Sequence, residues 1–216
     1  MAVVPAGQKI YHITHLRNLP QIVMYRQLWS DAKRMELKLD SEVVGISAIK
    51  RRRLEGIEVS CHPGTKVGHY VPFYFCPRSI MLYILHKGNH PDLNYADGQK
   101  PMVHLQADLR ATIEWADNSG IKWAFSNRNA GTWVADFFSR SGDLNKVNWA
   151  AVAATDFRDP VVKEGKQAEF LMFEAFPWAL VESIGVMDRP TRKAVADSMA
   201  GADHQPPVGV EREWYY

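Results

Sequence analysis

Apolar residues recur along the chain in short runs, and their spacing changes between the alternation typical of strands and the wider period typical of helices. Residues 69–75 are apolar enough to form a strand that is buried on both faces. The segments with strand character are residues 9–15, 69–75, 102–106, 123–125, 168–173, 184–186 and 213–216.

Helical spacing separates most of these strands. The segments expected to be helical are residues 16–29, a short stretch around the basic residues 50–53, the stretch that Ser79 opens and that ends near Gly88, residues 109–116 with Asp108 as the cap, and residues 191–199. A turn or short helix is expected at residues 177–180. Residues 126–159 lack sustained alternation, which is typical of a functional insertion or a small helical lobe.

The order of these elements predicts an α+β fold with a split, mostly antiparallel sheet and helices on its flanks. With 46% hydrophobic and 23% charged residues in 216, the composition is that of a globular protein with one sizeable core. We therefore expect a single domain over residues 1–216, with residues 126–168 forming a loop or lobe. The two cysteines, Cys61 and Cys76, do not make a disulfide scaffold. No apolar run is long enough to span a membrane, and we expect a cytoplasmic protein.

The formal net charge of +2 conceals an uneven distribution. Residues 1–110 hold 15 basic and 9 acidic residues, a net of +6, whereas residues 111–216 hold 11 basic and 15 acidic residues, a net of −4. The near-neutral total therefore does not exclude a nucleic-acid substrate, because phosphates can be contacted locally by the basic half.

Common catalytic signatures are missing from the sequence. His86 and His90 have the spacing of neighbours on a helix, but Gly88 and Pro91 interrupt it, so solvated histidines are favoured over a zinc site. The Cys61-His62 pair has no partner CxxC motif, and we expect no metal. Neither a Gly-x-Ser-x-Gly elbow nor a glycine-rich phosphate loop is present.

Three features remain as candidate chemistry. Residues 11–15, Tyr-His-Ile-Thr-His, place two histidines and a hydroxyl at the end of a strand, and residues 50–53 form the cationic cluster Lys-Arg-Arg-Arg. Glu169 stands at the start of an apolar strand. Taken singly, each is more often structural: an edge strand, a solvated basic face or an edge charge.

Together with the long motif at residues 69–82, these features are more specific. The sequences YHITHLRNL (11–19), IKRRR (49–53), HYVPFYFCPRSIML (69–82), KQAEFLMFEAFPWAL (166–180) and the closing EWYY resemble, in the same order, those of the DarT family of DNA ADP-ribosyltransferase toxins. The resemblance implies an ADP-ribosyltransferase fold whose split sheet holds NAD+ as co-substrate. It also implies transfer of ADP-ribose to a base of single-stranded DNA, usually thymine.

The same resemblance assigns roles to individual residues. His12 matches the residue that contacts the NAD+ ribose, while Ile13 and Thr14 match those that hold the nicotinamide end, partly through backbone groups. Arg53 and Glu169 match the catalytic arginine and glutamate, with Arg53 also contacting NAD+. Residues 125–169 correspond to the substrate-recognition loop.

Two positions depart from the family pattern. Ile80 replaces a proline at a helix start, which we expect to be neutral, and Asn129 replaces a histidine that is common in the recognition loop. The base and its sequence context are therefore not carried over. Candidate DNA contacts are Arg128, Trp133, Arg140, Lys146 and Lys166, with Trp133 equally suited to the core of a lobe.

Chemistry suggests how the two catalytic residues divide the work. Cleavage of a nicotinamide–ribose bond develops oxocarbenium character, which a carboxylate such as Glu169 stabilises. An arginine is protonated at physiological pH, so Arg53 would bind phosphates or a deprotonated base, and Glu169 would accept the proton. The resemblance implies a toxin with a macrodomain antitoxin, and we expect a monomer. A transferase acting on RNA or protein and a non-catalytic nucleic-acid-binding module remain the alternatives.

Overall fold

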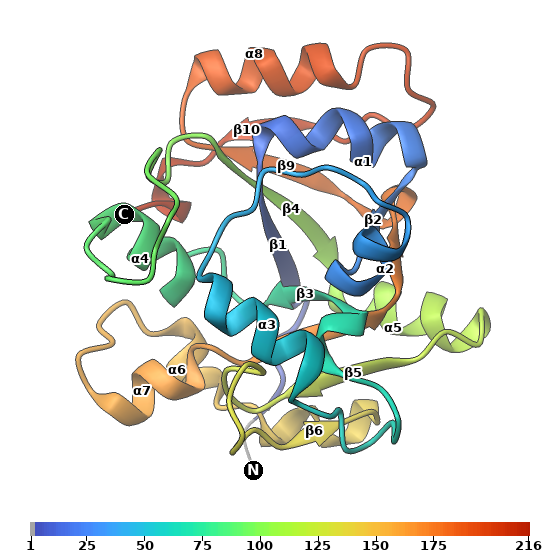
Figure 1. Ribbon diagram of the computed structural model, residues 1–216, viewed down its shortest axis with the longest axis vertical. Helices are drawn as coiled ribbons and strands as arrows, with labels where there is room; N and C mark the ends of the chain where they lie inside the picture. The colour runs from blue at the N-terminus through green and yellow to red at the C-terminus, as the bar shows by residue number, and fades with distance from the viewer. Residues whose placement is uncertain (1–2) are drawn as a thin grey trace.

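A computed structural model describes residues 3–216, so the first two residues of the expected domain lie outside the described residues. Its main feature is an eight-stranded sheet in the order β10-β9-β4-β1-β3-β7-β5-β6 (Figure 1). These strands are β1 (Lys9–His15), β3 (Tyr70–Tyr74), β4 (Met102–Asp108), β5 (Trp123–Ser126), β6 (Phe137–Phe138), β7 (Glu169–Phe173), β9 (Ser183–Val186) and β10 (Val208–Val210). Every pairing in the sheet is antiparallel except that of β9 with β10, which confirms the expected α+β architecture.

The sheet is split between β1 and β3. β1 pairs with β4 along its whole length, and β3 pairs with β7 over five residues. In contrast, β1 and β3 share a single register pair among the described residues, Tyr11 with Tyr74. Among the described residues, the two halves of the sheet are therefore joined by backbone pairing at one position only.

Helices and short 3-10 turns cover the sheet. The helices are α1 (Leu19–Tyr25), α2 (Asp31–Glu36), α3 (Ser47–Glu55), α4 (Ile80–Lys87), α5 (Leu109–Asn118), α6 (Trp149–Ala153), α7 (Pro160–Gly165) and α8 (Arg189–Ser198). The 3-10 turns are Leu16–Asn18, Val67–His69, Ser141–Lys146, Trp178–Leu180 and Arg212–Trp214. In Figure 1, α1 and α8 lie at one end of the molecule and α6, α7 and β6 at the other, with α3 crossing in front of β3.

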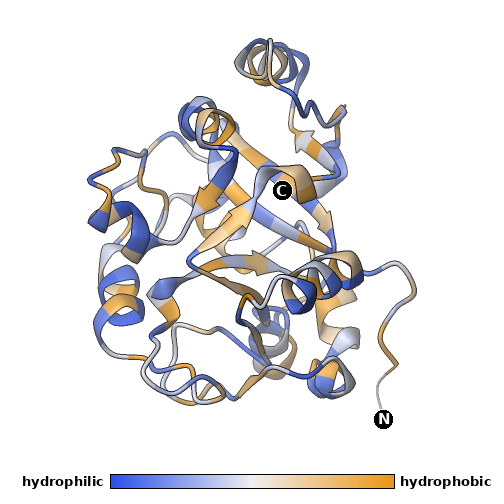
Figure 2. Cartoon of the chain, turned by 90° about the vertical axis from the view of Figure 1, so that its right-hand side faces the viewer, coloured by the Kyte–Doolittle hydropathy of each residue, from blue (hydrophilic) through white to orange (hydrophobic). Residues whose placement is uncertain are grey.

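Local sequence signals place several helix ends correctly. The Ser79 hydroxyl accepts a hydrogen bond from the Leu82 N–H, and Asp108 accepts one from the Ala111 N–H, so both act as the expected caps. Gly88 ends α4 in the left-handed conformation, with φ of 60°. The core lies between the sheet and these helices, where apolar residues concentrate in the central strands (Figure 2).

The expectation of one helix over residues 16–29 is wrong. The chain forms a 3-10 turn, then α1, and Arg26 ends α1 with a φ of 56°. Residues 27–29 form β2 (Gln27–Trp29), which pairs with β8 (Ala175–Pro177) in a separate two-stranded sheet. Apolar residues of α1 and β2 face the same core. Their combined spacing along the sequence therefore resembles that of one continuous helix.

The carboxy-terminal strand expected at residues 213–216 is also wrong. The structure has a 3-10 turn at Arg212–Trp214, and the strand that pairs with β9 is β10, at residues 208–210. Trp214 lies directly over Gly185 of β9, where a Cβ atom would overlap its ring. The closing aromatic residues therefore pack onto the sheet instead of extending it.

Residues 30–66 contain α2 as well as the expected helix around residues 50–53, which is α3, and residues 126–168 contain the short elements β6, α6 and α7. No helix among residues 3–216 combines the length and apolar character that crossing a membrane requires.

Candidate active site

A cavity of about 220 Å³ opens at the split between β1 and β3. Its walls come from the end of β1, from β3, from the head of β7, from α3 and from the segment between α2 and α3. The polar and charged side chains among the lining residues include His12, Thr14, Asn18, Asp31, Arg34, Lys50, Arg53, Tyr74, Asn129, Gln167 and Glu169. The cavity thus collects His12, Ile13, Thr14, Arg53 and Glu169, which the sequence places up to 157 residues apart.

Arg53 and Glu169 form a bidentate ion pair in the cavity wall. Arg53 Nη1 donates to Glu169 Oε1 at 3.0 Å and Nη2 donates to Oε2 at 2.9 Å. Only 13% of the Arg53 side chain and 2% of the Glu169 side chain are exposed. Burial opposes the charged form of Arg53, but the Glu169 carboxylate outweighs burial and raises the pKa of the guanidinium. Arg53 is therefore fixed as a cation.

Glu169 is held from the recognition loop as well. The Ala130 N–H donates to Glu169 Oε1 at 3.0 Å, and the Glu169 N–H donates to the Ser126 hydroxyl at 3.1 Å. Oε1 therefore accepts two hydrogen bonds and Oε2 accepts one. Because each carboxylate oxygen has two acceptor positions, Oε2 keeps one for a substrate.

Tyr74 stands opposite Glu169 in the register of β3 and β7. Burial, and next the nearby Glu169 carboxylate, raise the pKa of its phenol, so the hydroxyl stays protonated. Tyr74 lies within the VPFYF motif at residues 71–75 and was not among the expected site residues.

His12 donates from one ring nitrogen and leaves the other free. Nδ1 lies 2.8 Å from the Pro72 carbonyl, which can only accept, so Nδ1 carries the proton. Burial lowers the pKa of His12 to about 4, although the hydrogen bond to Pro72 opposes this shift. The ring is neutral at physiological pH, and Nε2 has no protein partner among the described residues.

Thr14 and Ile13 differ in what they present. The Thr14 hydroxyl oxygen accepts a hydrogen bond from Asn18 Nδ2 at 3.0 Å, so its own proton remains available. The Ile13 side chain packs with Leu82 and Leu85 in an apolar cluster while also bordering the cavity.

Residues of the basic cluster at 50–53 have different partners: Arg53 pairs with Glu169, whereas Lys50 pairs with Asp31. Lys50 Nζ donates to Asp31 Oδ1 at 3.2 Å, and Arg34 of α2 donates to the same oxygen at 3.2 Å. Burial opposes ionisation of Asp31, but Lys50 and then Arg34 outweigh it and lower the pKa of the carboxyl. Asp31 was missed in the sequence, where it stands in a polar stretch without a motif.

Asn129 lies at the cavity, where the family histidine was expected. Its Nδ2 donates to Gln167 Oε1 at 3.0 Å, and its Oδ1 accepts from the Gly131 N–H at 2.7 Å. Gln167 also borders the cavity, although it was not among the expected site residues. Two amide side chains therefore stand beside the Arg53–Glu169 pair.

The remaining candidates for DNA contact differ in their exposure and in the contacts they make within the protein. Trp133 is 70% exposed, which excludes the core role. Arg128 pairs with Glu164, and Lys146 lies 5.3 Å from the centre of the Phe138 ring. The expectation that Lys166 contacts DNA is wrong, as shown by its burial and bonds.

The Lys166 side chain is only 4% exposed, and its Nζ donates to the carbonyls of Val152 and Ala154. These bonds attach the end of α7, which Lys166 caps, to the end of α6, so the lysine has a structural role. Within residues 3–216, no group of three or more His, Cys, Asp or Glu side chains could hold a metal ion.

The cavity at the split of the antiparallel sheet, with buried Glu169 at the head of a strand that lines it, matches the ADP-ribosyltransferase fold that the sequence resemblance implies, and comparison with known proteins confirms this class. A model of the family described as DarT, ssDNA thymidine ADP-ribosyltransferase, matches residues 11–216. The chain belongs to the DarT family.

Relatives and solved structures cover almost the whole chain. It is 36% identical over 214 residues to a DNA ADP-ribosyl transferase of Thermus aquaticus, covering 98% of this chain and 90% of that protein. The structure of Thermus sp. 2.9 DarT in complex with ADP-ribosylated ssDNA superposes with a TM-score of 0.88, at 32% identity over 100% of both chains. The same protein in complex with NAD+ gives a TM-score of 0.84, at 32% identity over 99% of this chain and 100% of that chain.

Proposed function

We propose that this DarT-family enzyme transfers ADP-ribose from NAD+ to a thymine base in single-stranded DNA and releases nicotinamide. The observation that carries the proposal is the Arg53–Glu169 pair, buried in the cavity wall with one acceptor position of Glu169 Oε2 unused. The DNA and NAD+ complexes of the Thermus sp. 2.9 protein support it.

Two polar groups of the cavity keep a hydrogen-bonding position that the protein does not use, and both suit NAD+. His12 Nε2 is a neutral acceptor that suits a ribose hydroxyl, and the Thr14 hydroxyl retains a proton to donate. Apolar side chains such as Ile13 and Ile46 border the same space and suit the face of the nicotinamide ring. We assign His12, Ile13, Thr14 and Arg53 to NAD+ binding.

The reaction exchanges one glycosidic bond for another. The bond between ribose C1 and the nicotinamide nitrogen breaks, its electrons leave with nicotinamide, and a ring nitrogen of the base forms the new bond at C1. The proton of that ring nitrogen passes to Glu169 Oε2, the oxygen with the free acceptor position. The charge of Glu169 also stabilises the positive character that develops at C1.

Arg53 has a supporting electrostatic role in this scheme. Its raised pKa and its two hydrogen bonds to Glu169 make it unsuited to accept a proton. Instead, it orients the carboxylate and stabilises negative charge on the base as the proton leaves.

The recognition loop provides the surface for DNA. The loop contacts α3 closely, because a Cβ atom at Gly131 would lie 3.1 Å from Ile49, and one at Gly56 would lie 2.7 Å from the ring of Trp133. The exposed indole of Trp133 therefore lies at the end of α3, the helix that carries Arg53, where it is available for stacking with a flanking base. Because the target base must leave any duplex to enter the cavity, single-stranded DNA is the favoured substrate.

The cellular setting follows from family membership. We propose a single domain over residues 1–216 that acts as a monomeric cytoplasmic toxin and is opposed by a macrodomain antitoxin that removes ADP-ribose from DNA.

The test is mass spectrometry of an oligonucleotide library after incubation with the enzyme and NAD+. We expect a mass increase of one ADP-ribose on thymine-containing single strands, and fragmentation gives the sequence context. Label on RNA or on protein only would replace DNA with that substrate, and no binding of NAD+ by calorimetry would favour a non-catalytic module.

A further inference from the structure

The segment between α2 and α3, residues 37–46, forms one wall of the cavity without regular secondary structure of its own. Ser41, Glu42, Val44, Gly45 and Ile46 all border the cavity. The backbone of such a segment has to be fixed by bonds to other elements, or it does not present a defined surface to a ligand. We refer to residues 37–46 as the cavity strap.

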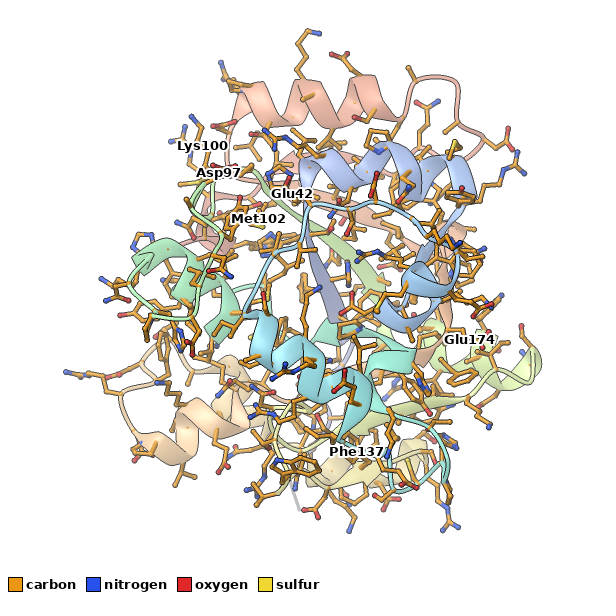
Figure 3. The ribbon with its side chains drawn as sticks, in the orientation of Figure 1. Glu42, Asp97, Lys100, Met102, Phe137 and Glu174 are labelled. Carbon is orange, nitrogen blue, oxygen red and sulfur yellow. The ribbon has the colours of Figure 1, made fainter. Side chains whose placement is uncertain are left out.

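Asn18 binds the backbone of the cavity strap at its middle. The Glu42 N–H donates to Asn18 Oδ1 at 2.7 Å, and Asn18 Nδ2 donates to the Glu42 carbonyl at 3.0 Å. One amide side chain thus satisfies both backbone groups of a single residue, as a neighbouring strand would. Figure 3 shows Glu42 close to α1, the helix whose N-cap residue is Asn18.

The same side chain also reaches a residue assigned to NAD+. Asn18 Nδ2 donates to the Thr14 hydroxyl oxygen at 3.0 Å. Since that oxygen accepts from Asn18, the hydroxyl proton is directed away from it and is available to the cavity. Asn18 therefore fixes two separate parts of the cavity wall, the cavity strap and the Thr14 hydroxyl.

Asn18 stands where an asparagine side chain usually caps a helix. Asn18 precedes α1 as its N-cap residue, and asparagine is among the residues that most often cap a helix with the side chain. Here the side chain makes no hydrogen bond to α1. The hydrogen bonds of its side chain go to Thr14 and Glu42, so helix capping does not account for asparagine at this position.

A second contact holds the neighbouring residue from the other side. Arg34 of α2 donates to the hydroxyl of Ser41, and Arg34 is itself bonded to Asp31. Arg17 pairs with the Glu42 carboxylate at 3.2 Å, but its side chain is 70% exposed, so this ion pair contributes little. Asn18 is thus the contact that fixes the backbone of Glu42.

We propose that Asn18 is a positioning residue for NAD+ binding, which holds the cavity strap and the Thr14 hydroxyl in the geometry that the dinucleotide requires. This inference rests on the proposed function, because it takes NAD+ as the ligand of the cavity. Asn18 acts through Thr14 and Glu42 and has no role in the proton transfer at Glu169. Its loss should therefore change the affinity for NAD+ more than the rate of the chemical step.

The experiment compares Asn18→Ala with Arg17→Ala in initial-rate kinetics and in calorimetric titration with NAD+. For Asn18→Ala we expect the KM and Kd for NAD+ to rise about ten-fold, from the loss of three hydrogen bonds. We expect kcat to stay within about three-fold and the KM for the oligonucleotide within about two-fold. Arg17→Ala, which removes only the exposed ion pair to the same residue, should leave the KM for NAD+ within about two-fold.

A purely structural role for Asn18 would lower the melting temperature and the active fraction, and hence kcat, while KM stayed constant. That result would overturn the proposal, and so would an unchanged Kd for NAD+ in a folded variant. Asn18→Asp matches asparagine in volume and keeps the acceptor for the Glu42 N–H but loses both donated bonds, so it provides a second variant should alanine unfold the protein. We expect its KM for NAD+ to rise at least about five-fold. Failure of the wild-type protein to bind NAD+ would instead count against the proposed function.

Discussion

Two histidines on neighbouring strands, His12 of β1 and His104 of β4, show the same local chemistry with different consequences. Each has a ring nitrogen bonded to a proline carbonyl, His12 to Pro72 at 2.8 Å and His104 to Pro77 at 3.0 Å. Burial lowers the pKa of both rings to about 4, against the effect of these hydrogen bonds. The two histidines differ in whether the second ring nitrogen has a hydrogen-bond partner within the protein.

Nδ1 of His104 lies 3.1 Å from the Tyr215 hydroxyl, which also bonds the carbonyls of Met102 and Gly185. His104 is completely buried, and its polar atoms are all used within the protein. His12, in contrast, borders the cavity, and its Nε2 has no protein partner among the described residues. A buried histidine with a lowered pKa is therefore not by itself a sign of a site, and the unused acceptor is what distinguishes His12.

The largest expected effect tests whether the cavity is where the chemistry occurs. Glu169→Gln removes the charge and the proton acceptor, so we expect the rate of ADP-ribose transfer to DNA to fall about 1,000-fold or more. NAD+ binding by calorimetry should remain within a few-fold. Glu174→Gln is the matched control, because Glu174 is exposed just beyond the other end of β7 (Figure 3), and its rate should be unchanged. Near-normal transfer by Glu169→Gln would refute the catalytic assignment.

Replacing each histidine by alanine should separate binding from stability. His104→Ala leaves a cavity and unpaired groups in the core, so we expect a loss of about 2–4 kcal/mol in the free energy of unfolding. Its Kd for NAD+ should stay within about two-fold. His12→Ala should instead weaken NAD+ binding about ten-fold with the smaller loss of stability.

Urea denaturation and calorimetry on the same two proteins measure both quantities. Equal effects of the two substitutions on NAD+ binding would contradict the distinction between the histidines.

The pH dependence of stability tests what the histidines share. Since both pKa values are lower in the folded protein than the ordinary value of 6.5, the unfolded chain binds more protons between pH 6.5 and about 4. Stability from these groups is complete above pH 6.5 and is lost as pH falls toward 4. The fall amounts to about 3 kcal/mol for His104, which is fully buried.

Urea denaturation at a series of pH values should show this decline, and His104→Ala should reduce its slope. A slope that the substitution leaves unchanged would place the proton uptake elsewhere.

Sequence signals succeeded where the determining contacts are local or repeated in a long motif. Ser79 and Asp108 cap the helices that follow them because the acceptor and the bonded N–H are three residues apart. The five site residues expected from the family motifs all border one cavity, although their individual roles remain predictions.

Signals failed where the contact is distant in sequence. The end of α1 depends on the left-handed backbone at Arg26 and on the pairing of β2 with β8, about 150 residues further along. From the sequence, Lys166 is expected to be an exposed cation. In the fold, its Nζ donates to the carbonyls of Val152 and Ala154, which lie 14 and 12 residues earlier in the chain. Asn18 reads as a helix cap, and only the path of the cavity strap shows that its side chain is used elsewhere.

The smallest expected effect extends the comparison from histidines to two tryptophans that each lie against a glycine. Trp214 covers Gly185 within the sheet, whereas Trp133 lies over Gly56 with 70% of its surface exposed. Trp133→Ala should raise the KM for single-stranded DNA about 5- to 100-fold, the range for loss of one stacked base, with stability unchanged within about 0.5 kcal/mol. Trp214→Ala, the matched control, should lower the melting temperature and leave the KM for DNA within about two-fold. If both substitutions changed only stability, the surface beside Gly56 would not be where DNA stacks, and the loop would contact DNA through its cations alone.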